Sequence, residues 1–303
     1  APRASQPAGG SASSSGGAAP WSRAAPPRVG GRDAQPAVGE VDGLAALDQQ
    51  GGPTPAFEKW DPGRFEHVAL LQQALRNQGY VDLCFDREAH RHVAVKVMPA
   101  SWVCESHEAF VATHTDENEL PWRDIGATFY LSRVAGLPCV CDFVGLFKRQ
   151  SSEHGEEVCM VLSYCEGGDL FSLLERSLSV VGAGRESLTR PLMRKVVQAV
   201  RDVHARGLSH GDLSLENVLL AIPLEEDPEA AVVKLIDFGA CGGRRVRGVR
   251  GKPSYQAPEA HAGEDYDALA ADAFSVGVMI FTLAVGNYPW KSTRPHVSRL
   301  GDA

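Results

Sequence analysis

The chain is organised around residues 208–220, Leu-Ser-His-Gly-Asp-Leu-Ser-Leu-Glu-Asn-Val-Leu-Leu. It places the carboxylate of Asp212 and the amide of Asn217 five residues apart, between apolar residues at both ends. A carboxylate in such a loop can accept the proton of an attacking hydroxyl, and an amide oxygen five residues later can hold a divalent metal on phosphates. The pair therefore predicts chemistry on phosphate groups.

Three further motifs flank this loop, namely Val-Ala-Val-Lys (93–96), Lys-Leu-Ile-Asp-Phe-Gly (234–239) and Gln-Ala-Pro-Glu (256–259). Asp-Phe-Gly alone would be weak evidence, but the four motifs in this order resemble the protein kinase superfamily. The resemblance implies an α+β fold of two lobes, a small β-rich N-lobe and a mainly helical C-lobe. It also implies that Lys96 binds ATP, and that Asn217 and Asp237 hold Mg²⁺ or Mn²⁺.

Length, charge and cysteine content limit the possible classes. With 303 residues the chain can bury the core of one two-lobed domain, and its net charge of −8 argues against a general nucleic-acid binder. Its seven cysteines include no Cys-x-x-Cys pair, which favours reduced thiols in an intracellular, cytoplasmic protein. The longest apolar run, residues 274–286, is shorter than a membrane span and predicts a buried helix. A targeting segment before Ala1 stays an alternative.

Composition divides the chain into two regions. Residues 1–56 are dominated by Ala, Gly, Pro and Ser, which predicts a disordered tail, whereas residues 57–303 predict the kinase-like domain. We expect the N-lobe at about 57–163, the hinge at about 163–168 and the C-lobe at 169–303. Because a full lobe of this type continues for several more helices, we expect this one to be truncated. We predict strands at 67–74 (with a helix as the alternative), 79–86, 92–98, 139–147 and 157–162, a polar turn at 149–156, and a helix at about 121–134.

The resemblance also implies a nucleotide site between the lobes. Besides Lys96 and Asp237, its residues would be Val81, Ala94, Leu162, Ser163, Cys165, Asp169 and Leu219. Apolar side chains would enclose the adenine, and the hinge backbone would face the purine edge. Asp169 would reach a ribose hydroxyl, although an acid after two glycines can instead be only a helix cap.

Two features depart from the family pattern in the N-lobe. Where a kinase has Gly-x-Gly-x-x-Gly, residues 74–81 keep only Gly79, which predicts weaker phosphate binding. The acid that should pair with Lys96 would fall on Ala127 or Thr128, and neither is acidic. Asp124 is the best substitute, with Glu119 behind it. Either acid could instead be an ordinary first-turn residue favoured by the helix dipole.

Further departures lie near the catalytic loop. Gly211 replaces the usual arginine and Ser214 the usual lysine, while Lys252 occupies the position of a usual threonine. We therefore predict that Lys252 and Ser214 have exchanged roles, so that Lys252→Ala lowers kcat far more than Arg250→Ala does.

Residues 240–253 contain no Ser, Thr or Tyr, which predicts activity without phosphorylation of this segment. Its basic residues either favour acidic substrates or form a solvated loop.

The function we predict is transfer of the ATP γ-phosphate to Ser or Thr of a protein substrate. Asp212 would orient the hydroxyl, with Lys96, Asn217 and Lys252 as the other catalytic residues. A pseudokinase that acts as a binding scaffold is the first alternative, because two glycines are missing. A small-molecule phosphotransferase is the second, because His-Gly-Asp also occurs in kinases of aminoglycosides and choline.

Overall fold

The computed structural model describes residues 55–74, 78–152, 155–177, 182–224 and 228–295. Every feature described below lies within the unit Glu40–Ala303. The tail predicted for residues 1–56 lies outside the described residues, apart from its last two. Residues 75–77, within the glycine-poor stretch, lie outside them as well.

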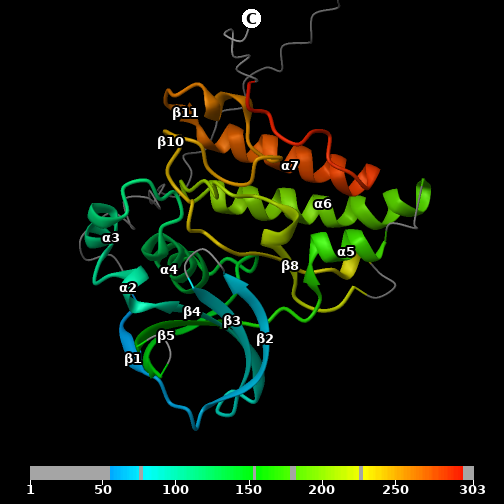
Figure 1. Cartoon of the computed structure of the whole chain (residues 1–303). Coiled ribbons are helices and arrows are strands. Elements are labelled where there is room, and N and C mark those ends of the chain that lie inside the picture. Colours follow the sequence, from blue (N-terminus) through cyan, green and yellow to red (C-terminus); the bar gives the residue numbers. More distant parts are fainter. Residues whose placement is uncertain (1–54, 75–77, 153–154, 178–181, 225–227, 296–303) are drawn as a thin grey trace, which may run out of the picture. The chain divides into compact units, whose positions relative to one another are not determined.

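A six-stranded sheet forms the N-terminal part of the domain (Figure 1). Its strands in chain order are β1 (Phe57–Lys59), β2 (Phe65–Ala74), β3 (Gly79–Asp86), β4 (Arg91–Pro99), β5 (Phe143–Ser151) and β6 (Gly155–Ser163). Their spatial order is β1-β5-β6-β4-β3-β2, and β1 and β5 are parallel. The strands predicted at 67–74, 79–86 and 92–98 are confirmed.

The prediction for β5 and the turn after it was partly wrong. The strand expected at 139–147 begins at Phe143 and runs to Ser151, so much of the polar turn predicted at 149–156 is strand. Arg149 lies opposite Glu157 in the ladder, and its Nε donates to Glu157 Oε2 at 2.7 Å. Paired opposite charges make these polar residues compatible with strands. The short strand β1 was not predicted.

Three helices follow β4. They are α2 (Ala100–Val103), α3 (His107–Thr113) and α4 (Pro121–Phe129), and α4 continues as a π-helical stretch, η1 (Tyr130–Val134). The helix predicted at 121–134 is therefore confirmed, with a widened last turn. Pro121 suits its first position because proline has no N–H to leave unpaired there. Ile125 packs with Met98 and Met160, which fixes α4 against the sheet.

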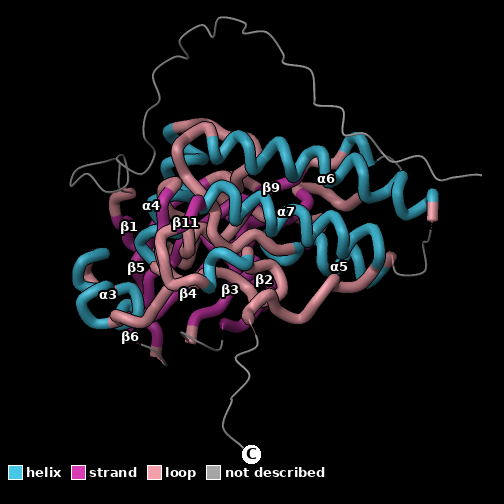
Figure 2. The backbone as a smooth tube through the Cα atoms, turned by 90° about the horizontal axis from the view of Figure 1, so that it is seen from above, coloured by secondary structure: helices cyan, strands magenta, loops and turns pink. Residues whose placement is uncertain are grey.

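The C-terminal part is mainly helical (Figure 2). Its helices are α5 (Leu170–Arg176), α6 (Ala183–His204) and α7 (Ala268–Val285). The short strands are β7 (Gly168–Asp169), β8 (Val218–Leu220), β9 (Val233–Leu235), β10 (Arg245–Val246) and β11 (Tyr266–Asp267). Three 3₁₀ turns complete it, η2 (Leu215–Asn217), η3 (Pro228–Ala230) and η4 (Pro258–His261). The predicted two-lobed α+β fold class is confirmed.

The core of this part supports residues 208–220. The apolar face of α6 is buried and forms one cluster with residues of 208–220 and of α7, namely Leu192, Val196, Val200, Val203, Leu208, Leu213, Leu215, Val278 and Met279. Apolar anchors on both sides of Asp212 are therefore held in the core, and the loop between them has little freedom to move.

Among the described residues, one helix, α7, is long and apolar enough to cross a membrane. That test is also passed by core helices of water-soluble proteins, and 44% of α7 is buried within the structure. Its buried side packs against α6, and its exposed side carries Ile280, Phe281 and Val285.

Candidate active site

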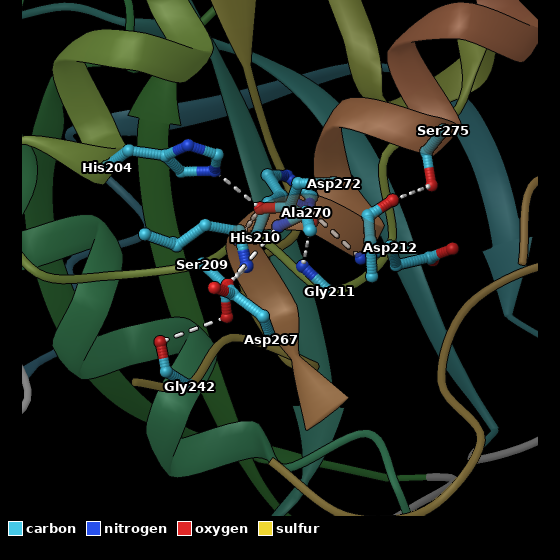
Figure 3. Close-up of polar contacts among 12 residues, drawn as sticks. His204, Ser209, His210, Gly211, Asp212, Gly242, Asp267, Ala270, Asp272 and Ser275 are labelled. Atoms are coloured by element: carbon cyan, nitrogen blue, oxygen red, sulfur yellow. Dashed lines mark hydrogen bonds and ion pairs between the residues drawn. The ribbon is translucent and has the colours of Figure 1, made fainter. Parts of the chain in front are cut away.

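A carboxylate of α7 holds the loop that contains His210, Gly211 and Asp212. Asp272 is 2% exposed, and its Oδ2 accepts from His210 N–H at 2.7 Å while its Oδ1 accepts from Gly211 N–H at 2.9 Å (Figure 3). His204 Nε2 of α6 lies 2.8 Å from Asp272 Oδ2. Through these bonds Asp272 braces the loop from α7.

Asp212 and Asn217 are brought together by the turn η2. Asn217 Nδ2 donates to the backbone oxygen of Asp212 at 2.7 Å and to its Oδ2 at 3.2 Å. The amide nitrogen is therefore occupied by Asp212, while no described residue donates to the amide oxygen. An amide oxygen in this state is free to act as a ligand for a hard cation.

Lys96 of β4 lies between two carboxylates. Its Nζ is 2.7 Å from Asp124 Oδ2 and 3.4 Å from Asp237 Oδ1. Burial alone would lower the pKa of Lys96, but Asp124 and Asp237 outweigh burial and raise it. The charge of Lys96 in turn lowers the pKa of Asp237. Lys96 and Asp237 are therefore both charged around neutral pH, as phosphate and metal binding require.

Asp124 is the acid that pairs with Lys96, although the family pattern places that acid at residue 127 or 128. Its side chain is 4% exposed, and its Oδ1 accepts from Phe238 N–H at 2.9 Å. The same carboxylate thus holds both Lys96 and the turn after Asp237. Ala127 and Thr128, the residues at the expected place, are buried. Thr128 Oγ1 instead donates to Asp124 Oδ1 at 3.4 Å.

The turn at Asp237 is strained. Asp237 has a φ of +65°, a region that residues other than glycine enter rarely. Strain of this kind persists where surrounding contacts impose it, and it gathers at functional sites. Here the Lys96 ion pair and the Phe238 N–H bond to Asp124 impose it.

Lys252 and Ser214 meet as the predicted exchange requires. Lys252 Nζ donates to Ser214 Oγ at 2.9 Å, and the backbone N–H of Lys252 donates to Asp212 Oδ1 at 3.1 Å. Lys252 Nζ also lies 3.4 Å from Glu216 Oε1, a contact that was not predicted. Burial raises the pKa of Asp212, and the nearby charge of Lys252 offsets part of the rise.

One face of the sheet presents the residues predicted to enclose the adenine. Val81 lies opposite Lys96, and Ala94 opposite Leu162, so these four side chains share a face. All four are partly exposed, whereas Val93, Val95 and Val97 on the opposite face are buried. Leu219, also partly exposed, lies on β8 opposite Asp169 of β7.

The hinge residues are engaged within the protein. Ser163 N–H donates to Asp142 O at 2.9 Å, and Ser163 Oγ accepts from Asp142 N–H at 2.9 Å. The Cys165 carbonyl accepts from Gly168 N–H at 3.4 Å. Asp169 accepts from Ser172 N–H at 2.7 Å and from Ser172 Oγ at 2.8 Å, so the structure shows it as the cap of α5. Its contact with ribose stays a prediction.

Comparison with known proteins agrees with this geometry. The family model described as the protein kinase domain matches residues 77–300, which is most of the chain. The chain belongs to the protein kinase family. Both the strand carrying Lys96 and the helix carrying Asp272 lie within the matched range.

Individual relatives align over shorter segments. Maternal embryonic leucine zipper kinase of Danio rerio is 35% identical over 46% of this chain and 20% of its own length. CBL-interacting protein kinase 29 of Oryza sativa subsp. japonica is 36% identical over 45% of this chain and 29% of its own length. Serine/threonine-protein kinase ULK1 of Homo sapiens is 31% identical over 49% of this chain and 14% of its own length. The chain thus spans less than a third of the length of each of these kinases.

Several contacts of this kinase site gave no signal in the sequence. The basic residues 244–252 were predicted either to favour acidic substrates or to form a solvated loop, and several of them bind to other parts of the protein. Arg244 Nε donates to Asp267 Oδ2 at 2.9 Å, and Arg247 donates to Gly263 O at 2.9 and 3.0 Å. Arg250 is half-buried. Such partners lie 10 to 23 residues away and are set by the path of the chain, not by local spacing.

Proposed function

We propose that this protein kinase transfers the γ-phosphate of ATP to a serine or threonine of a protein substrate. The observation that supports this best is the simultaneous assembly of the Lys96 ion pairs and the Asp212–Asn217 pair. Lys96 would bind the α- and β-phosphates, and Asp212 would orient the attacking hydroxyl and accept its proton. Positioning and electrostatics then supply the catalysis.

The donor set fits a divalent metal that is held jointly with the nucleotide. Among the described residues, no group of three or more His, Cys, Asp or Glu could hold a metal alone. Asp237, kept ionised by Lys96, and the free amide oxygen of Asn217 supply two hard oxygen ligands, and ATP phosphates would supply others. When bound, Mg²⁺ or Mn²⁺ supplies charge neutralisation on the phosphates.

Protein residues would also stabilise the transferred group. The backbone N–H of Lys252 donates to Asp212, and the ammonium group of Lys252 donates to Ser214. A positive charge at this point would stabilise negative charge on the γ-phosphate, which is the role of the lysine that Ser214 replaces. An acidic substrate would have fewer free partners than the composition suggests, because Arg244 and Arg247 are already bound.

Two measurements separate the proposed function from its alternatives. ATP should raise the melting temperature of the protein only when magnesium or manganese is present. Label from γ-labelled ATP should then appear on Ser and Thr of a generic protein, and not on a panel of small alcohols. Binding without transfer would favour the pseudokinase scaffold, and transfer to an alcohol the small-molecule phosphotransferase. Absence of any shift at millimolar ATP would contradict all nucleotide-dependent readings.

A further inference from the structure

Arg250 has an unusual environment. Its guanidinium is half-buried, and none of the ion pairs found among the described residues involves it. Nη1 donates to Ala240 O at 2.9 Å and to Cys241 O at 3.5 Å. Burial lowers the pKa of Arg250, and the nearby charge of Arg123 lowers it further. Placing a charge there without a carboxylate costs stability, so the contact calls for a functional explanation.

The carbonyl of Cys241 links Arg250 to α4. Arg123 Nη1 of α4 donates to the same oxygen at 2.8 Å. The next residue, Asp124, binds Phe238 N–H at 2.9 Å, so α4 fixes the segment after Asp237 at two points. Arg250, which comes later in the chain, holds the same segment through the carbonyls of Ala240 and Cys241. The segment is therefore held between the helix that carries the Lys96 partner and the residues that precede the 256–259 motif.

The residues directly after Arg250 contact the catalytic carboxylate. Gly251 has a φ of +74°, and a Cβ built on it would lie 2.9 Å from Asp212 Oδ1. Lys252 N–H donates to that same Oδ1 at 3.1 Å. A displacement of Arg250 would therefore also move Gly251 and the N–H of Lys252, which lie against Asp212.

The backbone at Gly211 explains why residue 211 has no side chain that could hold the segment after Asp237, so that Arg250 holds it instead. Its φ is +81°, and a Cβ at this position would lie 2.3 Å from Ala240 O. No side chain fits there while the Ala240 carbonyl keeps its place. Arg250 holds this carbonyl in that place through its 2.9 Å bond.

We propose that Arg250 is a positioning residue that keeps the segment after Asp237 in place relative to Asp212, without a phosphate on that segment. This inference rests on the proposed kinase function. Because of this role, Arg250→Ala is not a suitable comparison for Lys252→Ala. Arg247, which is exposed and donates to Gly263 O, is the matched control.

The test compares the full chain with Arg250→Ala, Arg250→Lys and Arg247→Ala. Loss of charged hydrogen bonds to two carbonyls should lower kcat roughly tenfold to a hundredfold in Arg250→Ala. KM for ATP should change little, because Lys96 and its partners are untouched. Added guanidinium ions should restore part of kcat in Arg250→Ala, and Arg250→Lys should lose less than Arg250→Ala. Arg247→Ala should stay within about twofold of the unmodified protein.

Amide hydrogen exchange supplies a readout that does not need activity. In Arg250→Ala the amides of Cys241, Gly242 and Lys252 should exchange faster, with α6 unaffected. If the unmodified protein shows no transfer, the proposed function fails, and this exchange pattern still decides the role of Arg250. If Arg250→Ala is unfolded, the comparison of Arg250→Lys with Arg247→Ala decides it. Exchange and kcat equal to those of Arg247→Ala would overturn the proposal.

Discussion

Replacing Asp124 tests the part of the site that the sequence predicted least directly. Asp124→Ala removes the 2.7 Å partner of Lys96 and leaves the N–H of Phe238 without its acceptor at 2.9 Å. Asp237 stays near Lys96, at 3.4 Å, and offsets part of the loss. Asp124→Asn keeps an acceptor for Phe238 and removes only the charge, so the two variants separate the two contacts.

The expected losses follow from burial. Breaking a buried ion pair costs about 3–5 kcal/mol, and an orphaned buried N–H adds about 1–3 kcal/mol before the Asp237 offset. Because domains have about 5–15 kcal/mol of stability, Asp124→Ala should lower the urea midpoint strongly. We expect Asp124→Asn to lose less stability. Both should lose about a hundredfold in kcat/KM, because misplacement of Lys96 by an ångström is enough for that.

Urea unfolding and steady-state kinetics at varied ATP check both expectations. Asp116→Ala is the matched control, since Asp116 is an exposed acid in the loop before α4. Its midpoint and kinetics should match those of the unmodified protein. If Asp124→Ala and Asp124→Asn both behaved like this control, Asp124 would be an ordinary first-turn acid and the pairing with Lys96 would have no functional weight.

Three further outcomes are expected. Lys252→Ala should lower kcat at least tenfold while Arg247→Ala does not, and Ser214→Lys should recover activity that Lys252→Thr loses; a silent Lys252→Ala would remove its catalytic role. Because Asp212 must be ionised to accept a proton and burial raises its pKa, kcat/KM should fall as pH falls through that raised pKa. Lys252→Ala removes a charge that lowers this pKa, so the acidic limb should move to higher pH, and an unmoved limb would contradict the coupling. Asp237→Asn should abolish the metal-dependent part of the ATP thermal shift, and an unchanged shift would exclude Asp237 as a ligand.

Local patterns were sufficient for most of the fold. Alternating apolar residues gave β3 and β4, and Pro121 with spaced apolar residues gave α4, because periodicity and caps act within one element. The polar residues of β5 misled the reading, since Arg149 is stabilised in the strand by Glu157 on the next one. Such a partner is visible only once the strands are paired.

In the site too, local motifs predicted some features, whereas contacts between distant segments were not predicted. Asp212, Asn217 and Asp237 were predicted as site residues from motifs whose members are close in sequence. Lys252 was found through its position in a motif, but its contact with Glu216 was not. The burial of Arg250 was not predicted, because it depends on where a chain segment ten residues earlier passes Gly211. Nothing in the local sequence distinguishes it from its basic neighbours.

The most direct test of the account is phosphate transfer by the unmodified protein and by Asp212→Asn, measured with γ-labelled ATP, magnesium and a protein substrate. Asp212→Asn should still show the magnesium-dependent thermal shift with ATP, because Lys96, Asn217 and Asp237 remain. The account predicts label on Ser or Thr with the unmodified protein and at least a hundredfold slower labelling with Asp212→Asn. Equal labelling by the two proteins, or none by either while both bind ATP, would contradict it.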